Sequence, residues 1–232
     1  MLGAMGAAMA RQLVAKQYKV VGFDLNAAAV EALARDGGHA AGSVAEAAAG
    51  ADVLIVMVVN ADQAESVLFD AGGIEALPPG APVIVGSTCA PERAAALADR
   101  CEAAGHPFVD APVSGGIVGA EAGTLTIMAA APKAAYEKTE GVLKAMGSNT
   151  YYIGATVGQG SAMKTVNQLM AGVHIAVAAE ALAFAERAGI DSALALEILS
   201  GSAASSWMLQ NRGPEMVKSS GRNVSAVDIF VK

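Results

Sequence analysis

The feature that most constrains the fold is an apolar run of seven residues, Val53–Val59 (VLIVMVV), which is bounded by Asp52 and Asn60. A short run rich in β-branched residues is typical of a central strand that is buried on both faces of a parallel sheet. Further short apolar runs lie at 19–24, 82–86 and 107–110. Strands that alternate with helices predict βαβ units and a parallel sheet with right-handed crossovers.

Helices are expected between these strands. A first helix, with small residues on one face, covers about residues 3–16. Asn26 is placed to cap a second helix, and Ser43 to begin a short third one. A further helix is predicted from about Pro91 to Ala104.

The pattern changes after Gly119. Residues 124–130 and 150–153 are predicted as the last strands, with a helix at about 133–146 between them. The segment Gly158–Gln159–Gly160 then opens a nearly all-apolar helical pattern that continues to Ala188 and ends at Gly189. Such a helix is expected to be buried between subunits or domains. Shorter helices are predicted at 191–200 and 205–218.

The sequence therefore predicts two domains. The first is a Rossmann-type α/β domain over residues 1–156, and the second is an all-α domain over residues 157–232. The second domain is expected to carry the substrate and subunit contacts.

Composition argues against several classes of function. The formal charge is −7, from 15 basic and 22 acidic residues, so a nucleic-acid partner is not expected. Two cysteines, Cys89 and Cys101, make no disulfide framework, and with three histidines they make no metal cluster. The longest apolar run is too short to span a membrane. We expect a cytoplasmic protein with a small anionic substrate.

The glycines at the start of the chain indicate a dinucleotide site. Gly3 and Gly6 fit the second and third glycines of G-x-G-x-x-G, and Asp24 follows 18 residues after Gly6 at the end of a predicted strand. A carboxylate there accepts hydrogen bonds from ribose hydroxyls and repels a 2′-phosphate, so NAD is expected rather than NADP. Two glycines alone are weak evidence. Met1 stands in place of the first glycine, and the strand that normally precedes it is absent from the printed sequence, which therefore looks truncated.

Two further motifs follow the glycines in the chain, DAPVSGG at 110–116 and GQGSAMKTVNQ at 158–168. Together they resemble the 3-hydroxyisobutyrate dehydrogenase family of β-hydroxyacid dehydrogenases, and the resemblance covers essentially the whole chain. Other segments resemble the L-threonate dehydrogenase branch of that family, namely those at 58–69, 167–183, 205–212 and 227–232. In this resemblance the chain stops before several further helices.

The resemblance implies an NAD-dependent oxidation of a small hydroxy acid, with Lys164 as the catalytic base. It places the substrate carboxylate on Ser114, Gly115 and Gly116. Gln168 stands where many members have a substrate-orienting asparagine, and Asn167 precedes it, so both are candidate substrate contacts. The expected cofactor contacts are Leu2, Gly3, Ala4, Met5, Gly6, Asp24, Leu25, Asn26, Val58, Val59, Gln63, Thr88 and Lys232.

Chemistry sets a condition on Lys164. A lysine accepts the hydroxyl proton only when it is neutral, and burial lowers its pKa towards working pH. A lysine taken alone is usually a solvent-exposed surface residue. The sequence S-G-G taken alone usually forms an ordinary turn without a binding role. His174 is expected to pack in the helix interface, and Cys89 to be a buried small residue. A pair such as Trp207 and Met208 is more often part of a core than of a cofactor site, and shaping the substrate pocket is its alternative role here.

Several functions stay open. L-Threonate, oxidised at its C2 hydroxyl, is the expected substrate. 3-Hydroxyisobutyrate oxidation and tartronate semialdehyde reduction are the alternatives within the family. A non-catalytic dinucleotide-binding protein is the alternative from another class. A homodimer or homotetramer is expected from the apolar helix.

Overall fold

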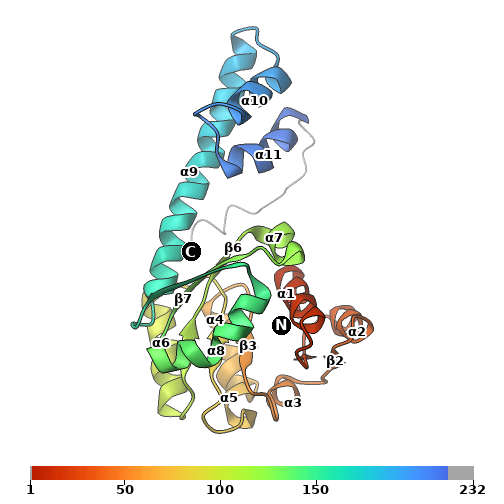
Figure 1. Ribbon diagram of the computed structural model, residues 1–232, viewed down its shortest axis with the longest axis vertical. Helices are drawn as coiled ribbons and strands as arrows, with labels where there is room; N and C mark the ends of the chain where they lie inside the picture. Colours follow the sequence, from red (N-terminus) through yellow and green to blue (C-terminus); the bar gives the residue numbers. More distant parts are fainter. Residues whose placement is uncertain (1, 219–232) are drawn as a thin grey trace. The chain divides into compact units, whose positions relative to one another are not determined.

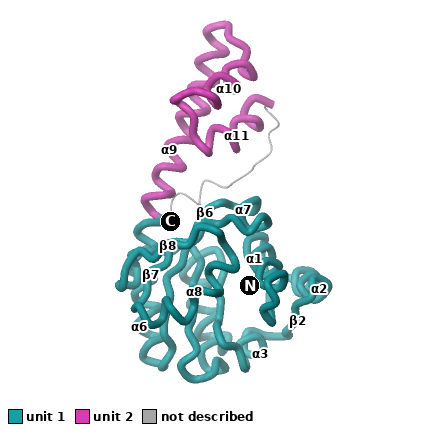
Figure 2. The backbone as a smooth tube through the Cα atoms, viewed as in Figure 1, with its two compact units in different colours: residues 1–164 teal, residues 165–232 magenta. Residues whose placement is uncertain are grey.

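The structure is a computed structural model, and it describes residues 2–218. The chain divides into two compact units, Met1–Lys164 and Thr165–Lys232 (Figure 2). The division lies inside a long helix, α9 (Gln159–Arg187), whose first residues belong to the first unit. The domain boundary predicted after residue 156 falls shortly before this helix begins.

The first unit is built on a mixed sheet (Figure 1). Three parallel strands, β3 (Leu54–Val56), β4 (Val83–Val85) and β5 (Phe108–Asp110), pair in that order. Next to β5 lies β7 (Thr126–Ala130), which runs antiparallel to β5 and to β6 (Val113–Ser114). The last strand, β8 (Asn149–Gly154), is parallel to β7. The sheet is therefore mostly parallel, as a Rossmann-type domain predicts, and its antiparallel pairings arise where the chain turns back after β6.

Two short strands form a separate parallel pair, β1 (Val21–Gly22) and β2 (His39–Ala40). A cavity of about 320 Å³ separates them from the larger sheet, and both β1 and β3 line it.

Helices cover both faces of the larger sheet, as alternating side chains of its strands require. One core joins Ile84, Val109 and Ile127 to α1 (Ala4–Ala15), α7 (Gly116–Ala122) and α8 (Lys133–Met146). The other joins Val83, Val85 and Phe108 to the helices α3 (Val44–Ala48), α4 (Ala61–Glu65), α5 (Gly73–Ala76) and α6 (Pro91–Ala103). A five-residue π-helix, η1 (Ser66–Asp70), continues α4.

The predicted helix starts are confirmed where a polar cap marks them. Asn26 caps α2 (Ala27–Arg35) by accepting the amide of Ala28 at 3.1 Å. Ser43 caps α3 in the same way through the amide of Glu46. The sequence did not predict α4, η1, α5, α7, β2 or β6, all of which are short.

The described part of the second unit is all-helical. It contains most of α9, then α10 (Ser192–Ser200) and α11 (Trp207–Lys218). Asp191 caps α10 through the amide of Leu194. A small core holds these helices together, made of Leu182, Ala185, Ala195, Leu196, Leu199, Met216 and Val217.

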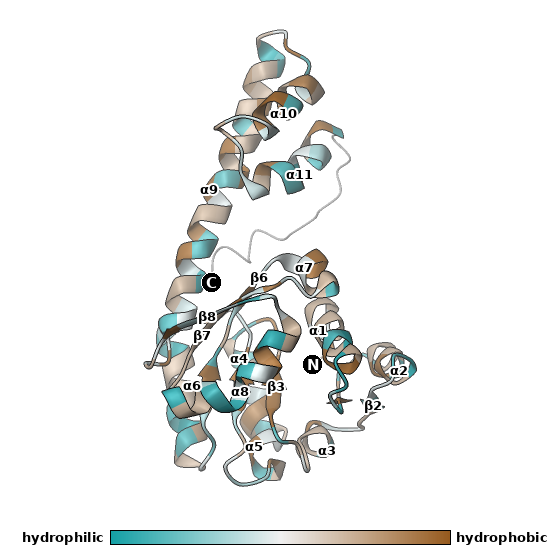
Figure 3. Ribbon diagram, viewed as in Figure 1, coloured by the Kyte–Doolittle hydropathy of each residue, from teal (hydrophilic) through white to brown (hydrophobic). Residues whose placement is uncertain are grey.

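Figure 3 shows hydrophobic residues along the length of α9, between hydrophilic ones. Several of these apolar side chains are exposed in the single chain. They include Val166, Leu169, Met170, Val173, Val177 and Phe184. The described chain therefore does not itself bury this helix, and burial between subunits stays a prediction. By length and composition alone α9 could cross a membrane, with a mean hydropathy of 1.5 over 18 residues.

Candidate functional site

The predicted site residues follow the carboxyl ends of parallel strands. Val58 and Val59 follow β3, Thr88 follows β4, and the Ser114 loop follows β5 and β6. Because β3, β4 and β5 are parallel, their carboxyl ends share one edge of the sheet. In open α/β sheets this edge is where ligands bind.

The start of α1 suits the pyrophosphate of a dinucleotide. Gly3 is its N-cap and makes no side-chain cap, and the first turn holds no acidic residue. The first amides of a helix lack partners within the helix, so they attract an anion. A Cβ on Gly3 would meet nothing within 4 Å, so this side of the helix is open to a ligand. Gly6, three residues further along, is buried.

Asp24 links the turn after β1 to Leu2 through hydrogen bonds. Its Oδ2 accepts the amide of Leu2 at 2.7 Å, and its Oδ1 accepts the amide of Asn26 at 2.9 Å. A carboxylate has about four acceptor positions, so both oxygens can still accept ribose hydroxyls. The residue next to it, Leu25, is exposed. These residues fit the adenosine half of NAD.

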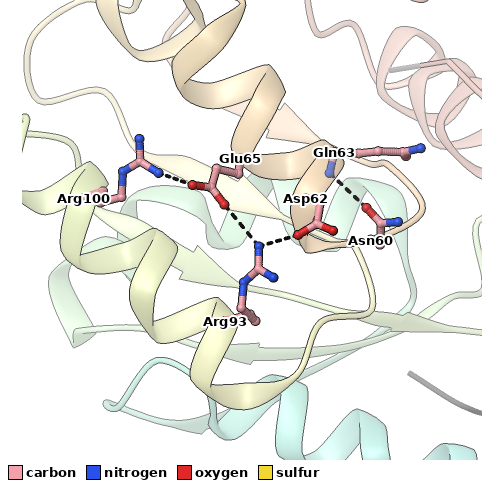
Figure 4. A network of polar contacts seen from close by, with 6 residues as sticks. All are labelled: Asn60, Asp62, Gln63, Glu65, Arg93 and Arg100. Atoms are coloured by element: carbon pink, nitrogen blue, oxygen red, sulfur yellow. Dashed lines mark hydrogen bonds and ion pairs between the residues drawn. The ribbon is translucent and has the colours of Figure 1, made fainter.

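The loop after β3 is held in shape by two side-chain acceptors. The amide of Val58 donates to Ser87 Oγ at 3.1 Å, and the amide of Val59 donates to Gln63 Oε1 at 3.0 Å. Asn60 in turn caps α4 through the amide of Gln63 at 2.9 Å (Figure 4). Gln63, a predicted cofactor contact, thus also shapes the loop. Ser87 is buried, and sequence reasoning gave it no role.

An ion-pair network ties the helix after this loop to α6 (Figure 4). Arg93 contacts Asp62 at 2.6 Å and Glu65 at 3.1 Å. Arg100 pairs with the same Glu65, and its guanidinium lies 3.7 Å from the centre of the Phe69 ring. The network therefore joins α4 and η1 to α6.

The S-G-G segment forms the turn from β6 into α7. Gly115 has φ +127° and Gly116 has φ +63°, backbone angles that L side chains rarely adopt. Ser114 is half-buried at the end of β6. The turn therefore requires glycine at both positions for conformational reasons.

Lys164 is buried near the start of α9, with an exposed fraction of 7%. Burial lowers its pKa from 10.5 to about 8. A substantial fraction of the amine is therefore neutral in weakly alkaline solution, which is the condition for accepting a proton.

Two residues to which sequence reasoning gave no role fix the start of α9. Asp110, at the end of β5, accepts the Ser161 hydroxyl at 2.7 Å and the Ser161 amide at 2.8 Å. It also accepts the amide of Gly158 at 3.1 Å. A charged residue at the end of an apolar strand was the available signal, but its partners lie far along the chain.

The remaining residues singled out from the sequence lie in different parts of the chain. In the second unit, Asn167 donates to Gln168 Oε1 at 3.1 Å. Cys89 is buried as predicted, whereas Trp207 is exposed rather than in the core. Lys232 lies outside the described residues.

Comparison with known proteins decides the family. Residues 2–154 match the sequence model described as the NAD binding domain of 6-phosphogluconate dehydrogenase. Residues 158–232 match the one described as NAD-binding of NADP-dependent 3-hydroxyisobutyrate dehydrogenase. L-Threonate dehydrogenase of Cupriavidus necator is 43% identical over 232 residues, which cover all of this chain and 78% of that protein.

The chain belongs to the 3-hydroxyisobutyrate dehydrogenase family. It is thus an NAD-dependent hydroxyacid dehydrogenase, as the sequence predicted. L-Threonate dehydrogenase of Escherichia coli K12 is 41% identical over 233 residues, covering all of this chain and 77% of that protein, which supports the predicted branch. The crystal structure of 3-hydroxyisobutyrate dehydrogenase from Salmonella typhimurium matches with a TM-score of 0.93 and 42% identity, covering all of this chain and 81% of that one.

The glycines of α1, Asp24 and the loop after β3 are the described residues that are predicted to contact the dinucleotide. The described geometry is compatible with it. The open side of Gly3 and the first turn of α1, which has no acidic residue, suit the pyrophosphate. The carboxylate of Asp24, held by backbone amides, suits the ribose of the adenosine half.

Proposed function

We propose that this hydroxyacid dehydrogenase oxidises L-threonate, or a close four-carbon sugar acid, at its C2 hydroxyl, with Lys164 as the general base. The observation that carries the role of Lys164 is its burial, which lowers its pKa to about 8. The substrate class is supported by L-threonate dehydrogenases that are 41–43% identical along the whole chain.

The reaction needs two transfers from the alcohol. Bound NAD would supply the acceptor for the hydride that leaves C2 with its electron pair. The neutral amine of Lys164 accepts the hydroxyl proton and becomes an ammonium, so the carbon is left as a ketone. In reduction the same ammonium returns the proton to the alkoxide oxygen. Burial favours the neutral amine before the oxidation step.

The S-G-G turn supports binding of the substrate carboxylate. The Ser114 hydroxyl and the amides of Gly115 and Gly116 can donate hydrogen bonds without adding a charge. Positive φ angles at both glycines are fixed by the turn, so the amides need little reorganisation on binding. The carboxylate orients C2 with respect to Lys164.

Asn167 and Gln168 follow Lys164 by three and four residues on α9. By helical spacing they lie towards the same side as the lysine. We propose that their amides bind the further hydroxyls of a sugar acid. The extra methylene of Gln168 relative to asparagine changes its reach, and therefore the preferred substrate length.

NAD is proposed as the preferred cofactor over NADP because Asp24 would repel a 2′-phosphate. The first turn of α1 would hold the pyrophosphate through Leu2, Gly3, Ala4, Met5 and Gly6. Leu25, Asn26, Val58, Val59, Gln63, Thr88 and Lys232 are proposed as further cofactor contacts.

The experiment for the general base is Lys164→Ala. Turnover should fall by at least about 10²-fold, as for loss of a general base, while NAD binding measured by calorimetry changes little. Lys144→Ala is the matched control, because Lys144 is exposed and, within the part of the chain that the structure describes, its ion pair is with Glu140. Comparable activity in Lys164→Ala and the wild type would remove Lys164 from the mechanism.

The substrate is tested with a panel of L-threonate, 3-hydroxyisobutyrate, glycerate and tartronate semialdehyde. The highest kcat/KM is expected for L-threonate. A second candidate is 3-hydroxyisobutyrate, favoured by the Salmonella typhimurium enzyme of that name at 42% identity. A preference for 3-hydroxyisobutyrate would reject the L-threonate assignment. Tight NADH binding without turnover of any member would favour a non-catalytic dinucleotide-binding protein.

We further propose a cytoplasmic homodimer or homotetramer. The exposed apolar side chains of α9 support an association between copies. Light scattering after gel filtration measures the mass in solution, and a monomer at micromolar concentration would contradict this proposal.

A further inference from the structure

We propose that Asp110 is a positioning residue that fixes the first turn of α9 and thereby holds Lys164 at the reacting hydroxyl. The inference rests on the proposed role of Lys164. It assigns to Asp110 no direct contact with substrate or cofactor.

The start of α9 lacks a cap of its own. The residue before the helix is Gly158, which has no side chain and a φ of +97°. Asp110 supplies the missing acceptor from the end of β5, 51 residues before Ser161. Its Oδ2 accepts the amides of both Gly158 and Ser161, as an N-cap side chain does for the first turn of a helix. The cap therefore joins α9 to the sheet.

The number of donors indicates an ionised carboxylate. Oδ2 receives two amides and Oδ1 receives the Ser161 hydroxyl, and a carboxylate accepts at all of these positions. The side chain is 2% exposed. Burial raises its pKa, and the hydrogen bonds from Ser161, Gly158 and Gly160 oppose that rise. A negative charge at a helix N-terminus is also stabilised by the helix dipole.

Backbone packing leaves this turn little freedom to shift. A Cβ on Gly160 would lie 2.5 Å from the carbonyl oxygen of Met128 on β7 and 2.7 Å from that of Asp110. A Cβ on Gly158 would lie 3.0 Å from the carbonyl oxygen of Pro91, the first residue of α6. The first turn thus touches β5, β7 and α6, and Asp110 adds the hydrogen bonds that fix its rotation.

Lys164 lies three residues after Ser161 on the same helix. This is about 4.5 Å along the axis, less than one turn. A displacement of the anchored turn is therefore transmitted directly to Lys164. Burial is the cause of the lowered pKa of Lys164, so loosening the turn would also admit water and raise that pKa.

The test compares Asp110→Asn with the milder Ser161→Ala. Asparagine keeps the shape of the side chain, but its NH2 group is a donor and cannot accept the hydrogen bonds that an oxygen of Asp110 accepts. Ser161→Ala removes only the hydroxyl. The first readout is the pH dependence of Lys164 acetylation by acetic anhydride, followed by mass spectrometry. The second is kcat and KM for L-threonate, or for whichever hydroxy acid the wild type turns over, across pH 6–10.

For Asp110→Asn we expect a fall in kcat of about tenfold or more, as for a misplaced reacting group. The KM for NAD should change by less than about threefold, since the contacts of the first turn of α1 remain. The apparent pKa of Lys164 should rise from about 8 towards its ordinary value. Ser161→Ala should show smaller changes in the same direction in kcat and in the apparent pKa of Lys164. In the double variant the two effects on kcat should add up to less than their sum.

Thr139→Ala is the control for a merely structural effect. Thr139 is a buried residue of α8 whose hydroxyl bonds to Ala135 and Tyr136. It should lower the melting temperature without changing the pKa of Lys164. The inference is overturned if folded Asp110→Asn and Ser161→Ala keep both kcat and the Lys164 pKa of the wild type. A fall in that pKa in Asp110→Asn also overturns it, because the carboxylate would then act through its charge.

The outcomes separate this inference from the proposed function. If Lys164→Ala stays active, the general base is wrong. If Lys164→Ala is inactive while the Asp110 and Ser161 variants behave as the wild type, only the positioning role of Asp110 is wrong.

Discussion

Gly160 packs directly against Met128: a Cβ atom at Gly160 would lie 2.5 Å from the carbonyl oxygen of Met128. That oxygen belongs to a strand of the sheet, so it cannot move aside as a flexible side chain does. Gly160→Ala should therefore displace the start of α9. We expect a loss of about 1–3 kcal/mol in the free energy of unfolding, as in other overpacked sites, and a lower kcat. Urea unfolding and steady-state kinetics measure both.

The matched control for this substitution is Gly201→Ala. A Cβ at Gly201 would come no closer than 3.8 Å to another atom, and its φ of −96° suits any residue. The control should be as stable as the wild type. If Gly160→Ala were equally harmless, the close packing of the helix start would not matter for stability or turnover.

Burial of Lys164 should cost stability at neutral pH. A pKa of about 8 in the folded protein against 10.5 corresponds to about 3 kcal/mol, so Lys164→Met should be more stable than the wild type at pH 7 by up to that amount. Between pH 8 and 10.5 the unfolded lysine binds the proton that the folded one has lost. The wild type therefore gains stability in that window, and the advantage of Lys164→Met should shrink.

Urea unfolding of both proteins at pH 7, 9 and 10.5 checks this linkage. Lys144→Met serves as the control, since Lys144 is exposed on α8. An advantage of Lys164→Met that stays constant across this window would show that the folded and unfolded pKa values of Lys164 are alike.

Local patterns predicted much of the fold. The bounds of α8 match the predicted helix at 133–146, and Asn26 and Ser43 cap the helices expected to begin there. Apolar runs located the parallel strands, although β1 covers only Val21–Gly22 of the run at 19–24. These features depend on neighbouring residues, so the sequence alone carries them.

Other features depend on contacts between distant residues. The antiparallel turn-back at β7 requires pairing across the sheet, and the helix α7 opens with Gly116, a residue that disfavours helices. At the site, Lys164 and the S-G-G turn could be identified from motifs. The bonds from Ser161 to Asp110 span 51 residues, and no local pattern marks them.

Asp24 should set the preference for NAD. Asp24→Asn removes the charge that repels a 2′-phosphate but keeps an oxygen for the backbone amides. The ratio of kcat/KM for NADP to that for NAD should be below one in the wild type and should rise about tenfold or more in the variant, in line with one charged contact. Asp36→Asn is the control, because Asp36 ends α2 and pairs with Arg11 at 3.8 Å. An equal rise in both variants, or a wild type that prefers NADP, would contradict the role of Asp24.

The ion-pair network at Arg93 should contribute only modestly to thermal stability, and only at low salt. Arg93 contacts Asp62 at 2.6 Å and Glu65 at 3.1 Å, but their side chains are 39–77% exposed, so water and ions weaken the attraction. Arg93→Gln should lower Tm by about 2 °C or less in dilute buffer. In 1 M NaCl, where charges are screened within about 3 Å, the difference should vanish. Arg11→Gln, whose pairs are longer at 3.8 Å, should change less. Calorimetry at both salt concentrations checks this, and a loss of more than about 5 °C that salt does not reduce would mean that Arg93 acts through packing instead.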